Sequence, residues 1–538
     1  MSQSYVVPIG RVKSEANEAL PAKKVHSSLK PSLALLAVFV IVWTLYGLIS
    51  AAPAAIHNDT AEAYVWGREF QLGYAQHPPF WAWIAGLWFE MFPRADWAFT
   101  LLAVLNAGLG LYGSWMLIGD FADGDKRLAA TGLLLLTPFY TFLAFKYNAN
   151  SIFLSLWPWT MHFFVRSIDR RHLTDAMLFG LFIGLAMLSK YFALILATAC
   201  FVAALMHPER RAYFNSAAPY VSVLVAALLF APHAWWLTLN GALPVHYFIH
   251  KTGLGVISVL IACLSLLTGV ILFHSIIIML IALVKRSDPR SWVTAFGTRW
   301  SEPRFRVLMT LAVLPLVLTV VAGLVFRLRL STNMTVGIFS LLPLLIIELA
   351  GTEGNDRLYR VVRSFVIAIT LVAMALSPVI AFAKIWYRGD INYTEPRKEL
   401  ARYATELWHK TTTLPLQYVG GSQRYENAVA FYSPDRPHVF IHLDSRRAPW
   451  VTAEDLDRAG FLVVCSTTDE QCLNSAAKVS PPQARRATLS LVHSFSGYTV
   501  GYSSFIVTIV PPHPSSSPNR AGTPKCDSYA LRQHFDRI

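Results

Sequence analysis

Long apolar segments separated by short polar loops recur through the first two thirds of this 538-residue chain. Most approach the roughly 17–25 helical residues that cross a hydrocarbon core of about 30 Å, and we read about eleven of them. They lie near 31–52, 97–119, 128–145, 150–165, 174–189, 191–206, 216–237, 254–284, 307–326, 333–350 and 364–386. Only 14% of the chain is charged, against about 25% in soluble domains. We therefore expect a mainly helical protein that crosses a membrane many times.

The basic residues predict the orientation of these segments. Arginine and lysine gather in the first 30 residues and in alternate loops, near 126–127, 166–171, 210–211, 285–306 and 357–363. Because cytoplasmic loops carry such an excess, we place residues 1–30 in the cytoplasm and the C-terminus outside. This distribution accounts for the net charge of +14 without nucleic-acid binding. The polar N-terminus lacks the pattern of a cleavable signal peptide.

Two stretches do not fit simple spans. Residues 176–206 would form a single helix of about 46 Å, with Lys190 near mid-membrane at a high cost. We expect instead a hairpin that turns at Ser189-Lys190-Tyr191 and brings Lys190 to the outer surface. Residues 80–92 are apolar but too short to span. We expect a helix lying in the outer interface, with three tryptophans at headgroup depth: Trp81, Trp83 and Trp88.

The composition changes after Trp386 to that of a soluble domain. We expect a transmembrane domain over 31–390, a small extracytoplasmic α/β domain over 391–510 and a disordered tail over 511–538. Strand patterns at 415–419, 438–443 and 461–465 alternate with helical patterns at 395–410, 423–432 and 452–459, and strand-like runs follow at 487–510. This alternation is typical of a small parallel sheet.

The cysteines leave one question open. Cys465 and Cys472 are close in the sequence of the expected outer domain. Whether they form a disulfide depends on geometry that the sequence does not give. Cys200 and Cys263 lie in apolar segments and are expected to pack there.

Acidic residues follow the first apolar segment directly. Asp59 has two interpretations: a general base that takes a proton from an attacking hydroxyl, or the N-cap of a helix that starts near Thr60. Glu62 lies one turn further on the same face. It either orients a substrate hydroxyl or completes a capping box. His77, in His77-Pro78-Pro79-Phe80, either contacts a phosphate or is structural.

Further polar residues fall on the same expected side of the membrane. Lys146 stands beside Asn148 and Asn150, which together offer a charge and amide donors to a phosphate or a sugar. Alternatively, the lysine snorkels to the surface. Arg327 and Arg329 fall on the side expected to be outside, where the positive-inside rule predicts few basic residues. They indicate either an anion site or anchorage among headgroups. The chain has no zinc-ligand spacing and no glycine-rich nucleotide loop, so we predict no metal site and no direct use of a nucleotide sugar.

These motifs resemble those of polyprenol-phosphate-sugar-dependent membrane glycosyltransferases. This is the superfamily of protein O-mannosyltransferases and lipid A aminoarabinose transferases, related to glycosyltransferase family 39, with the GT-C fold. Asp59 matches the first Asp of the family's acidic motif, and His77-Pro78-Pro79-Phe80 matches the element that follows it. Lys146-Tyr147-Asn148-Ala149-Asn150 and Leu188-Ser189-Lys190-Tyr191 match two further stretches. Thr60 departs from the family, which usually has Glu after the Asp.

The resemblance implies an inverting glycosyltransferase of the bacterial inner membrane with a periplasmic active site. The donor would be a polyprenyl-phosphate sugar, and the acceptor lipid A, the lipopolysaccharide core, another envelope glycan or, in protein O-mannosylation, a protein. Asp59 and Glu62 would be catalytic. Donor-phosphate contacts would come from His77, Lys146, Lys190, Arg327 and Arg329, and substrate contacts from Asn148, Asn150 and Tyr191.

Three points stay open. Relatives often need no metal, but a divalent cation on the acids is an alternative. A transporter or flippase of lipid-linked sugars would need polar residues at mid-span, whereas here they gather at one face. A non-catalytic envelope scaffold on the same fold is favoured by the Thr60 departure. The sequence sets neither the sugar, the acceptor nor the oligomeric state.

Overall fold

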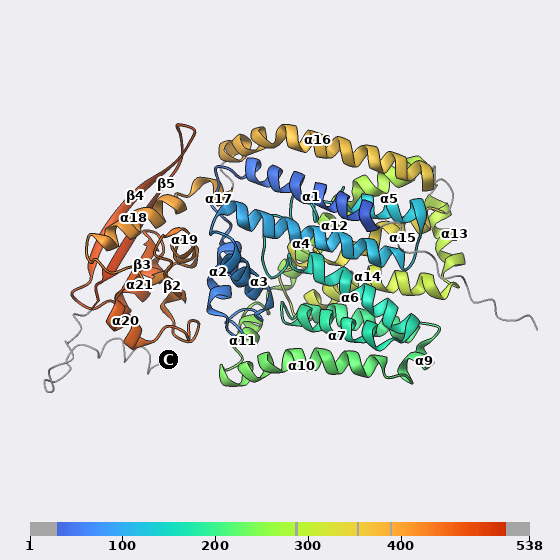
Figure 1. Cartoon of the computed structure of the whole chain (residues 1–538), viewed down its shortest axis with the longest axis horizontal. Helices are drawn as coiled ribbons and strands as arrows, with labels where there is room; N and C mark the ends of the chain where they lie inside the picture. Colours follow the sequence, from blue (N-terminus) through green and yellow to red (C-terminus); the bar gives the residue numbers. More distant parts are fainter. Residues whose placement is uncertain (1–28, 286–288, 352–354, 388–389, 513–538) are drawn as a thin grey trace, which may run out of the picture.

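The computed structural model describes residues 29–512 apart from 286–288, 352–354 and 388–389 (Figure 1). Most of the expected N-terminal segment, residues 1–28, and the tail from 513 lie outside this range. The described chain forms a large helical bundle and a smaller α/β part at one end of it (Figure 1).

The long axes of the main bundle helices run roughly alongside one another (Figure 1). The helices are α1 (Leu29–Ser50), α4 (Asp96–Gly119), α5 (Gly124–Leu134), α6 (Phe153–Arg170), α7 (Leu173–Met187), α8 (Ala193–Met206), α9 (Arg210–Phe214), α10 (Ala218–Leu239), α11 (Leu243–His250), α12 (Val256–Lys285), α13 (Pro289–Arg299), α14 (Pro303–Val325), α15 (Leu342–Leu349) and α16 (Asn355–Tyr387). Within the described residues, α4, α10, α12, α14 and α16 are long and apolar enough to cross a membrane. Shorter apolar helices accompany them, among them α7 and α8, and the mainly helical, multi-pass architecture is as expected.

Two of the expected spans are not continuous helices. Helix α5 ends at Leu134, and residues 135–152 form a series of turns. Pro138 accounts for the break, because proline has no N–H and clashes with the preceding turn of a helix. The expected span at 333–350 is likewise broken, into the short 3₁₀ helices η2 (Thr332–Thr335) and η3 (Ile338–Leu341) followed by α15. The first break places Lys146 and its neighbouring asparagines in a loop.

The expected hairpin is present, because α7 and α8 are separated by a turn at residues 188–192 that contains Lys190. A helix is also present where the interfacial helix is expected, as α3 (Phe80–Met91). Trp81, however, is fully buried within the protein, so the placement of all three tryptophans at headgroup depth is wrong for this one. Its indole packs edge-on against that of Trp66, and it belongs to the core rather than to a lipid-facing surface.

Helix α3 pairs with α2 (Asn58–Glu69), and the two cross where each carries a glycine. A Cβ atom at Gly67 would meet the backbone of Ala82, and one at Gly86 would meet the backbone of Gly67. Only glycine allows the two backbones to approach so closely. This crossing fixes the direction of α2, whose first turn carries Asp59.

The smaller part is built on a five-stranded sheet of order β2-β1-β3-β5-β4. Its elements are α17 (Ile391–Thr394), α18 (Arg397–His409), β1 (Tyr418–Gly421), α19 (Gln423–Tyr432), β2 (His438–Phe440), η4 (Ile441–Leu443), α20 (Ala453–Ala459), β3 (Phe461–Ser466), α21 (Glu470–Val479), β4 (Arg485–Phe495) and β5 (Tyr498–Val510). Strands β2, β1 and β3 are parallel, but β5 is antiparallel to both β3 and β4. The expected parallel layer is present in β2, β1 and β3, and the strand-like runs at 487–510 add an antiparallel hairpin of β4 and β5 at one edge.

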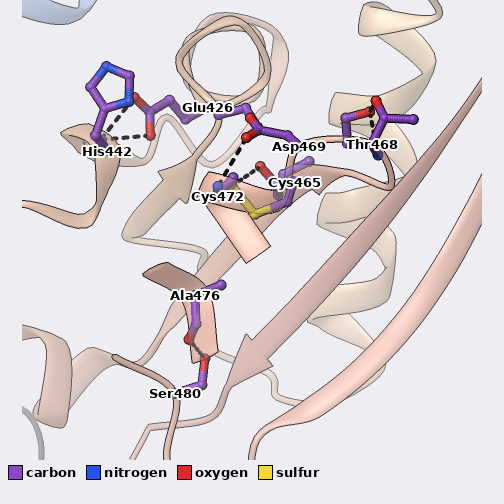
Figure 2. Close-up of a disulfide and its surroundings, with 11 residues drawn as sticks. Glu426, His442, Cys465, Thr468, Asp469, Cys472, Ala476 and Ser480 are labelled. Atoms are coloured by element: carbon purple, nitrogen blue, oxygen red, sulfur yellow. Dashed lines mark hydrogen bonds between the residues drawn. A yellow bond between two sulfur atoms is a disulfide. The ribbon is translucent and has the colours of Figure 1, made fainter. Parts of the chain in front are cut away.

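A disulfide joins Cys465, in β3, to Cys472, in α21 (Figure 2). Their Cα atoms are 5.7 Å apart, within the range that a disulfide spans. The side chain of Asp469 caps α21 by accepting from the N–H of Cys472 at 3.0 Å. The question that the sequence left open is thus answered, and α21 is a helix that the sequence patterns missed.

The α/β part is attached to the bundle by polar contacts as well as by packing. Arg397, at the start of α18, is almost fully buried and donates to Ile56 O at 3.0 Å, just before α2. Arg94 donates to Phe431 O at 2.9 Å and to Ser433 O at 3.0 Å. Helix α19 also packs against α2. The N-terminus of α2, which carries Asp59, therefore lies between the bundle and the α/β part.

Candidate functional site

The N-terminus of α2 presents Asp59 in its first turn. The N-cap is His57, whose Nδ1 accepts from the N–H of Asp59 at 3.1 Å. Burial lowers the pKa of His57 to about 4, so the ring is neutral and can accept. The interpretation of Asp59 as the N-cap is therefore wrong. Its carboxylate is free of the capping role, and its place at the positive end of the helix favours the charged form.

Asp59 is held by groups from the 146–150 loop. Lys146 Nζ lies 2.8 Å from Asp59 Oδ2, and Asn148 Nδ2 donates to the same oxygen at 3.3 Å. Burial would raise the pKa of Asp59, but Lys146, His57 and Asn148 together lower it below its usual value. The carboxylate is therefore ionised at neutral pH in the resting protein.

The asparagines of this loop continue the polar cluster toward Lys190. Asn148 Oδ1 accepts the N–H groups of Asn150 and Ser151, both at 2.9 Å, which directs its Nδ2 to Asp59. Asn150 Oδ1 accepts from Lys190 Nζ at 2.6 Å. Two lysines from different segments are thus fixed beside one carboxylate. The structure brings Asp59, Lys146, Asn148, Asn150 and Lys190 together as the sequence predicted.

Glu62 lies in the same helix but in a different environment. Its side chain is 6% exposed. Gln423 Nε2, from α19, donates to its Oε1 at 2.6 Å. Burial and the charge of Asp59 raise the pKa of Glu62 to about 8, so the carboxyl is mostly protonated at pH 7. Because α2 starts at Asn58, Glu62 is too far along the helix for a capping box, and that interpretation is wrong.

His77 lies among aromatic rings near the cluster. The rings of Trp66, Trp81 and Tyr247 all have centroids about 6 Å from the imidazole, at 6.3, 6.1 and 6.1 Å. Burial and nearby Lys190 lower the pKa of His77 to about 3. The imidazole is neutral in the resting protein and offers a hydrogen bond rather than a charge.

Tyr191 follows Lys190 and is held by a neighbouring helix. Its hydroxyl is 2.8 Å from His233 Nε2, and His233 Nδ1 is 2.7 Å from Leu72 O. Because a carbonyl only accepts, Nδ1 carries the proton and Nε2 accepts from the tyrosine. His233 thus joins α10, the α7–α8 turn and the segment after α2. These contacts fix the position of the Tyr191 side chain.

Arg327 and Arg329 are separate from the cluster. Both are exposed, and Arg327 donates through Nε to Leu254 O at 2.7 Å. No contact joins either arginine to Asp59, Lys146 or Lys190 among the residues that the structure describes.

Three site residues were not found from the sequence: His57, Gln423 and Tyr247. The His57 cap was readable in principle, because a polar side chain two residues before Asp59 can accept from its N–H. Gln423 and Tyr247 lie far from Asp59 in the sequence and carry no local signal. In the described part of the chain, no group of three or more His, Cys, Asp or Glu side chains is arranged to hold a metal ion.

The fold has known structural relatives. ArnT from Cupriavidus metallidurans in the apo state superposes on this chain with a TM-score of 0.56 at 14% identity. The match covers 88% of this chain and 97% of the ArnT chain. The same protein bound to undecaprenyl phosphate gives a TM-score of 0.54 at 16% identity, over 89% of this chain and 98% of that one. The expected GT-C fold, a helical membrane domain with a small C-terminal α/β part, is confirmed.

The sequence comparisons agree with this fold. The family model for dolichyl-phosphate-mannose-protein mannosyltransferase matches residues 76–236. The lipopolysaccharide core galacturonosyltransferase RgtA of Rhizobium johnstonii is 23% identical over 74% of this chain and 81% of its own length. RgtB of the same organism is 27% identical over 65% of this chain and 72% of its own. The resemblance drawn from the motifs is confirmed, and the chain is a membrane glycosyltransferase of the GT-C fold.

Proposed function

We propose that this enzyme moves a sugar from a polyprenyl-phosphate carrier to a lipid A, lipopolysaccharide core or other envelope glycan acceptor, with inversion at the anomeric carbon. Reaction takes place at the periplasmic face of the inner membrane. The acceptor class follows RgtA and RgtB, which are named for transfer to the lipopolysaccharide core. The donor class follows ArnT, which binds undecaprenyl phosphate.

The observation that carries this proposal is the Asp59 carboxylate, which is paired with Lys146, with Lys190 held nearby by Asn150. In the reaction the acceptor oxygen forms a bond to the anomeric carbon while the bond from that carbon to the phosphate oxygen breaks. Asp59 takes the hydroxyl proton as general base. The departing polyprenyl phosphate keeps the electron pair, and Lys146 and Lys190 stabilise its growing charge. A single displacement inverts the sugar centre.

The pKa of Asp59 links donor binding to this chemistry. In the resting protein Lys146 keeps the carboxylate weakly basic. A donor phosphate competes with Asp59 for the Lys146 ammonium. Once the ammonium turns to the phosphate, the pKa of Asp59 rises toward that of a buried carboxylate. The base then becomes stronger when a donor is present.

Glu62 and His77 complete the proposed site as neutral groups. A protonated Glu62 can donate a hydrogen bond to a substrate oxygen without adding a second negative charge beside Asp59. A neutral His77 can donate to the phosphate, whose charge would in turn favour imidazolium. The Asn148 and Asn150 amides and Tyr191 border the same space and are proposed substrate contacts. Arg327 and Arg329 have a more distant role, if any, as surface cations.

The disulfide supports the proposed orientation. Disulfides form and persist in oxidising compartments such as the periplasm. The bond between Cys465 and Cys472 belongs to the α/β part, and Asp59 lies where that part meets the bundle. The site and the disulfide therefore belong to the same side of the membrane.

The test compares wild type with Asp59→Asn, in a deletion strain and as purified full-length protein in nanodiscs. Asparagine keeps the shape but cannot take a proton, so we expect transfer to fall by about 10²–10⁴-fold. Donor binding, measured with undecaprenyl phosphate, should be retained. Asp356→Asn, in an exposed pair with Arg360, is the matched control.

Mass spectrometry of envelope lipids and glycans from the deletion strain identifies the acceptor. Loss of a sugar from a protein, with lipids and glycans unchanged, would replace the envelope acceptor with protein O-mannosylation. Normal transfer by Asp59→Asn would remove this residue from the mechanism. A purified protein that moves the lipid-linked sugar across a bilayer without transferring it would point to a flippase.

A further inference from the structure

A polar cavity lies at the end of the bundle remote from the α/β part. It has a volume of about 470 Å³, and residues at the end of α8, in α9 and at the start of α14 line it. Helix α9 lies at the far end of α10 from the sheet (Figure 1). Lys190 and Met206 are at opposite ends of α8, whose 14 residues span about 21 Å. The cavity is therefore not part of the Asp59 site.

Three arginines line this cavity: Arg210, Arg211 and Arg306. No acidic residue is among the lining residues. Arg306 Nε is buried and has no hydrogen-bond partner. A buried donor without a partner is costly. Because Nε has almost no exposed surface, an acceptor in the cavity reaches it only if the Arg306 side chain shifts.

The nearby acids are engaged elsewhere. Asp169 lies 3.1 Å from His207 Nε2 and 3.1 Å from Arg304 Nη1. His207, which lines the cavity, has both ring nitrogens engaged, since Nδ1 accepts from the N–H of Glu209 at 3.1 Å and Nε2 contacts Asp169. Glu209 pairs with Arg171 at 3.5 Å. The three cavity arginines are left with an excess of positive charge.

An apolar stripe leads to the same cavity. Leu194, Phe201 and Leu205 are all largely exposed on α8. Their spacing places them on one face of the helix, and Leu205 also lines the cavity. In a bilayer this face contacts acyl chains. A phosphate at the arginines and a chain along this stripe could belong to one molecule.

We propose that this cavity binds the phosphate headgroup of an anionic membrane lipid, at a site separate from the glycosyl-transfer site. Guanidinium groups suit phosphate because their donors form paired hydrogen bonds with its oxygens. Basic pockets between helices on the cytoplasmic side of membrane proteins bind such headgroups. An arginine that only snorkels into the general headgroup layer would need no cavity and would leave no buried donor unpaired.

The test measures retention of phosphatidylglycerol against phosphatidylcholine by full-length protein from mixed nanodiscs, using native mass spectrometry. The variant combines Arg210→Gln, Arg211→Gln and Arg306→Gln. We expect its phosphatidylglycerol affinity to fall by at least about ten-fold. The matched control combines Arg357→Gln, Arg360→Gln and Arg363→Gln in α16, which removes the same charge without touching the cavity.

A second variant with a single substitution tests the site even if the triple variant does not fold. Arg211 is exposed, so Arg211→Glu should fold normally while repelling the headgroup, and it should also lower retention. Inorganic phosphate is titrated in parallel. Binding of inorganic phosphate without selective retention of phosphatidylglycerol would make the ligand a soluble phosphate and overturn the lipid assignment. Equal retention by wild type and both cavity variants would overturn the site itself.

Discussion

Lys146 holds the central position in the polar cluster, because it contacts the proposed base and faces the proposed phosphate site. A lysine that only snorkels would be satisfied by headgroups and would cost little to remove. A lysine that stabilises transition-state charge is worth about 10²–10³ in rate.

We therefore expect Lys146→Ala and Lys190→Ala each to lower kcat/KM for the lipid donor by about 10²–10³-fold. The effect on the KM of the acceptor should be smaller. Lys146→Ala should also raise the pKa of Asp59, which the acid limb of the pH profile would report. Lys410→Ala, on the exposed surface of the α/β part, is the control. Wild-type donor kinetics in both variants would make these lysines boundary anchors.

Glu62 gives the site a predicted pH dependence. Its pKa in the folded protein, about 8, lies above the ordinary value of 4.5. The folded state therefore holds a proton that the unfolded state loses above pH 4.5. The stability linked to this proton is fully present below pH 4.5 and is lost as pH rises toward 8.

Thermal unfolding of Glu62→Gln should accordingly depend less on pH between 4.5 and 8 than that of wild type. Transfer by wild type should fall above pH 8, where a second charge develops beside Asp59, and Glu62→Gln should lack this alkaline fall. Identical pH profiles for the two proteins would show that Glu62 is charged at neutral pH or lies outside the reaction.

At the scale of elements, the disulfide fixes α21 to β3. The bond closes a short loop, with a sequence separation of 7 residues. Closing a loop of this length contributes about 2–3 kcal/mol in the chain-entropy model. The double substitution Cys465→Ser with Cys472→Ser should lower the stability of the α/β part by about this amount, while the bundle stays folded.

Denaturation followed by the near-UV signal, with and without reductant, measures this effect. Reductant should destabilise wild type and leave the double variant unchanged. The substitution Cys200→Ser is the control, because Cys200 is a buried free thiol in α8. If reductant left the stability of the wild-type protein unchanged, the disulfide would not form in the expressed protein.

At the scale of the whole molecule, the site and the basic cavity should face opposite sides of the membrane. A cysteine at Lys410, in the α/β part, should react with a membrane-impermeant thiol reagent in intact spheroplasts. A cysteine at Arg170, at the other end of the bundle, should react only after lysis. Both are placed in a background without Cys200, Cys263 and Cys526, which preserves the disulfide. The reverse labelling pattern would invert the proposed orientation.

The sequence by itself determined the membrane class, the α7–α8 hairpin and the core of the site. Apolar segment length and loop charge are local properties, because each segment partitions into the bilayer largely on its own composition. Asp59, Lys146 and Lys190 were likewise found because each stands in a short motif. Each of these features depends on a short stretch of sequence, so it can be recognised without knowing which distant segments are in contact.

Only the tertiary structure decided how these pieces meet. Glu62 is protonated because burial and the charge of Asp59 raise its pKa, and helix α19, whose Gln423 lies 361 residues away in the sequence, packs against α2. The chain leaves the helical conformation after α5, so the segment before Lys146 is not the continuous span expected at 128–145. Arg327 and Arg329 lie outside the cluster. The β4–β5 hairpin made the sheet mixed. Burial and pairing at such positions depend on which surfaces pack together, and packing between segments far apart in the chain leaves no local pattern in the sequence.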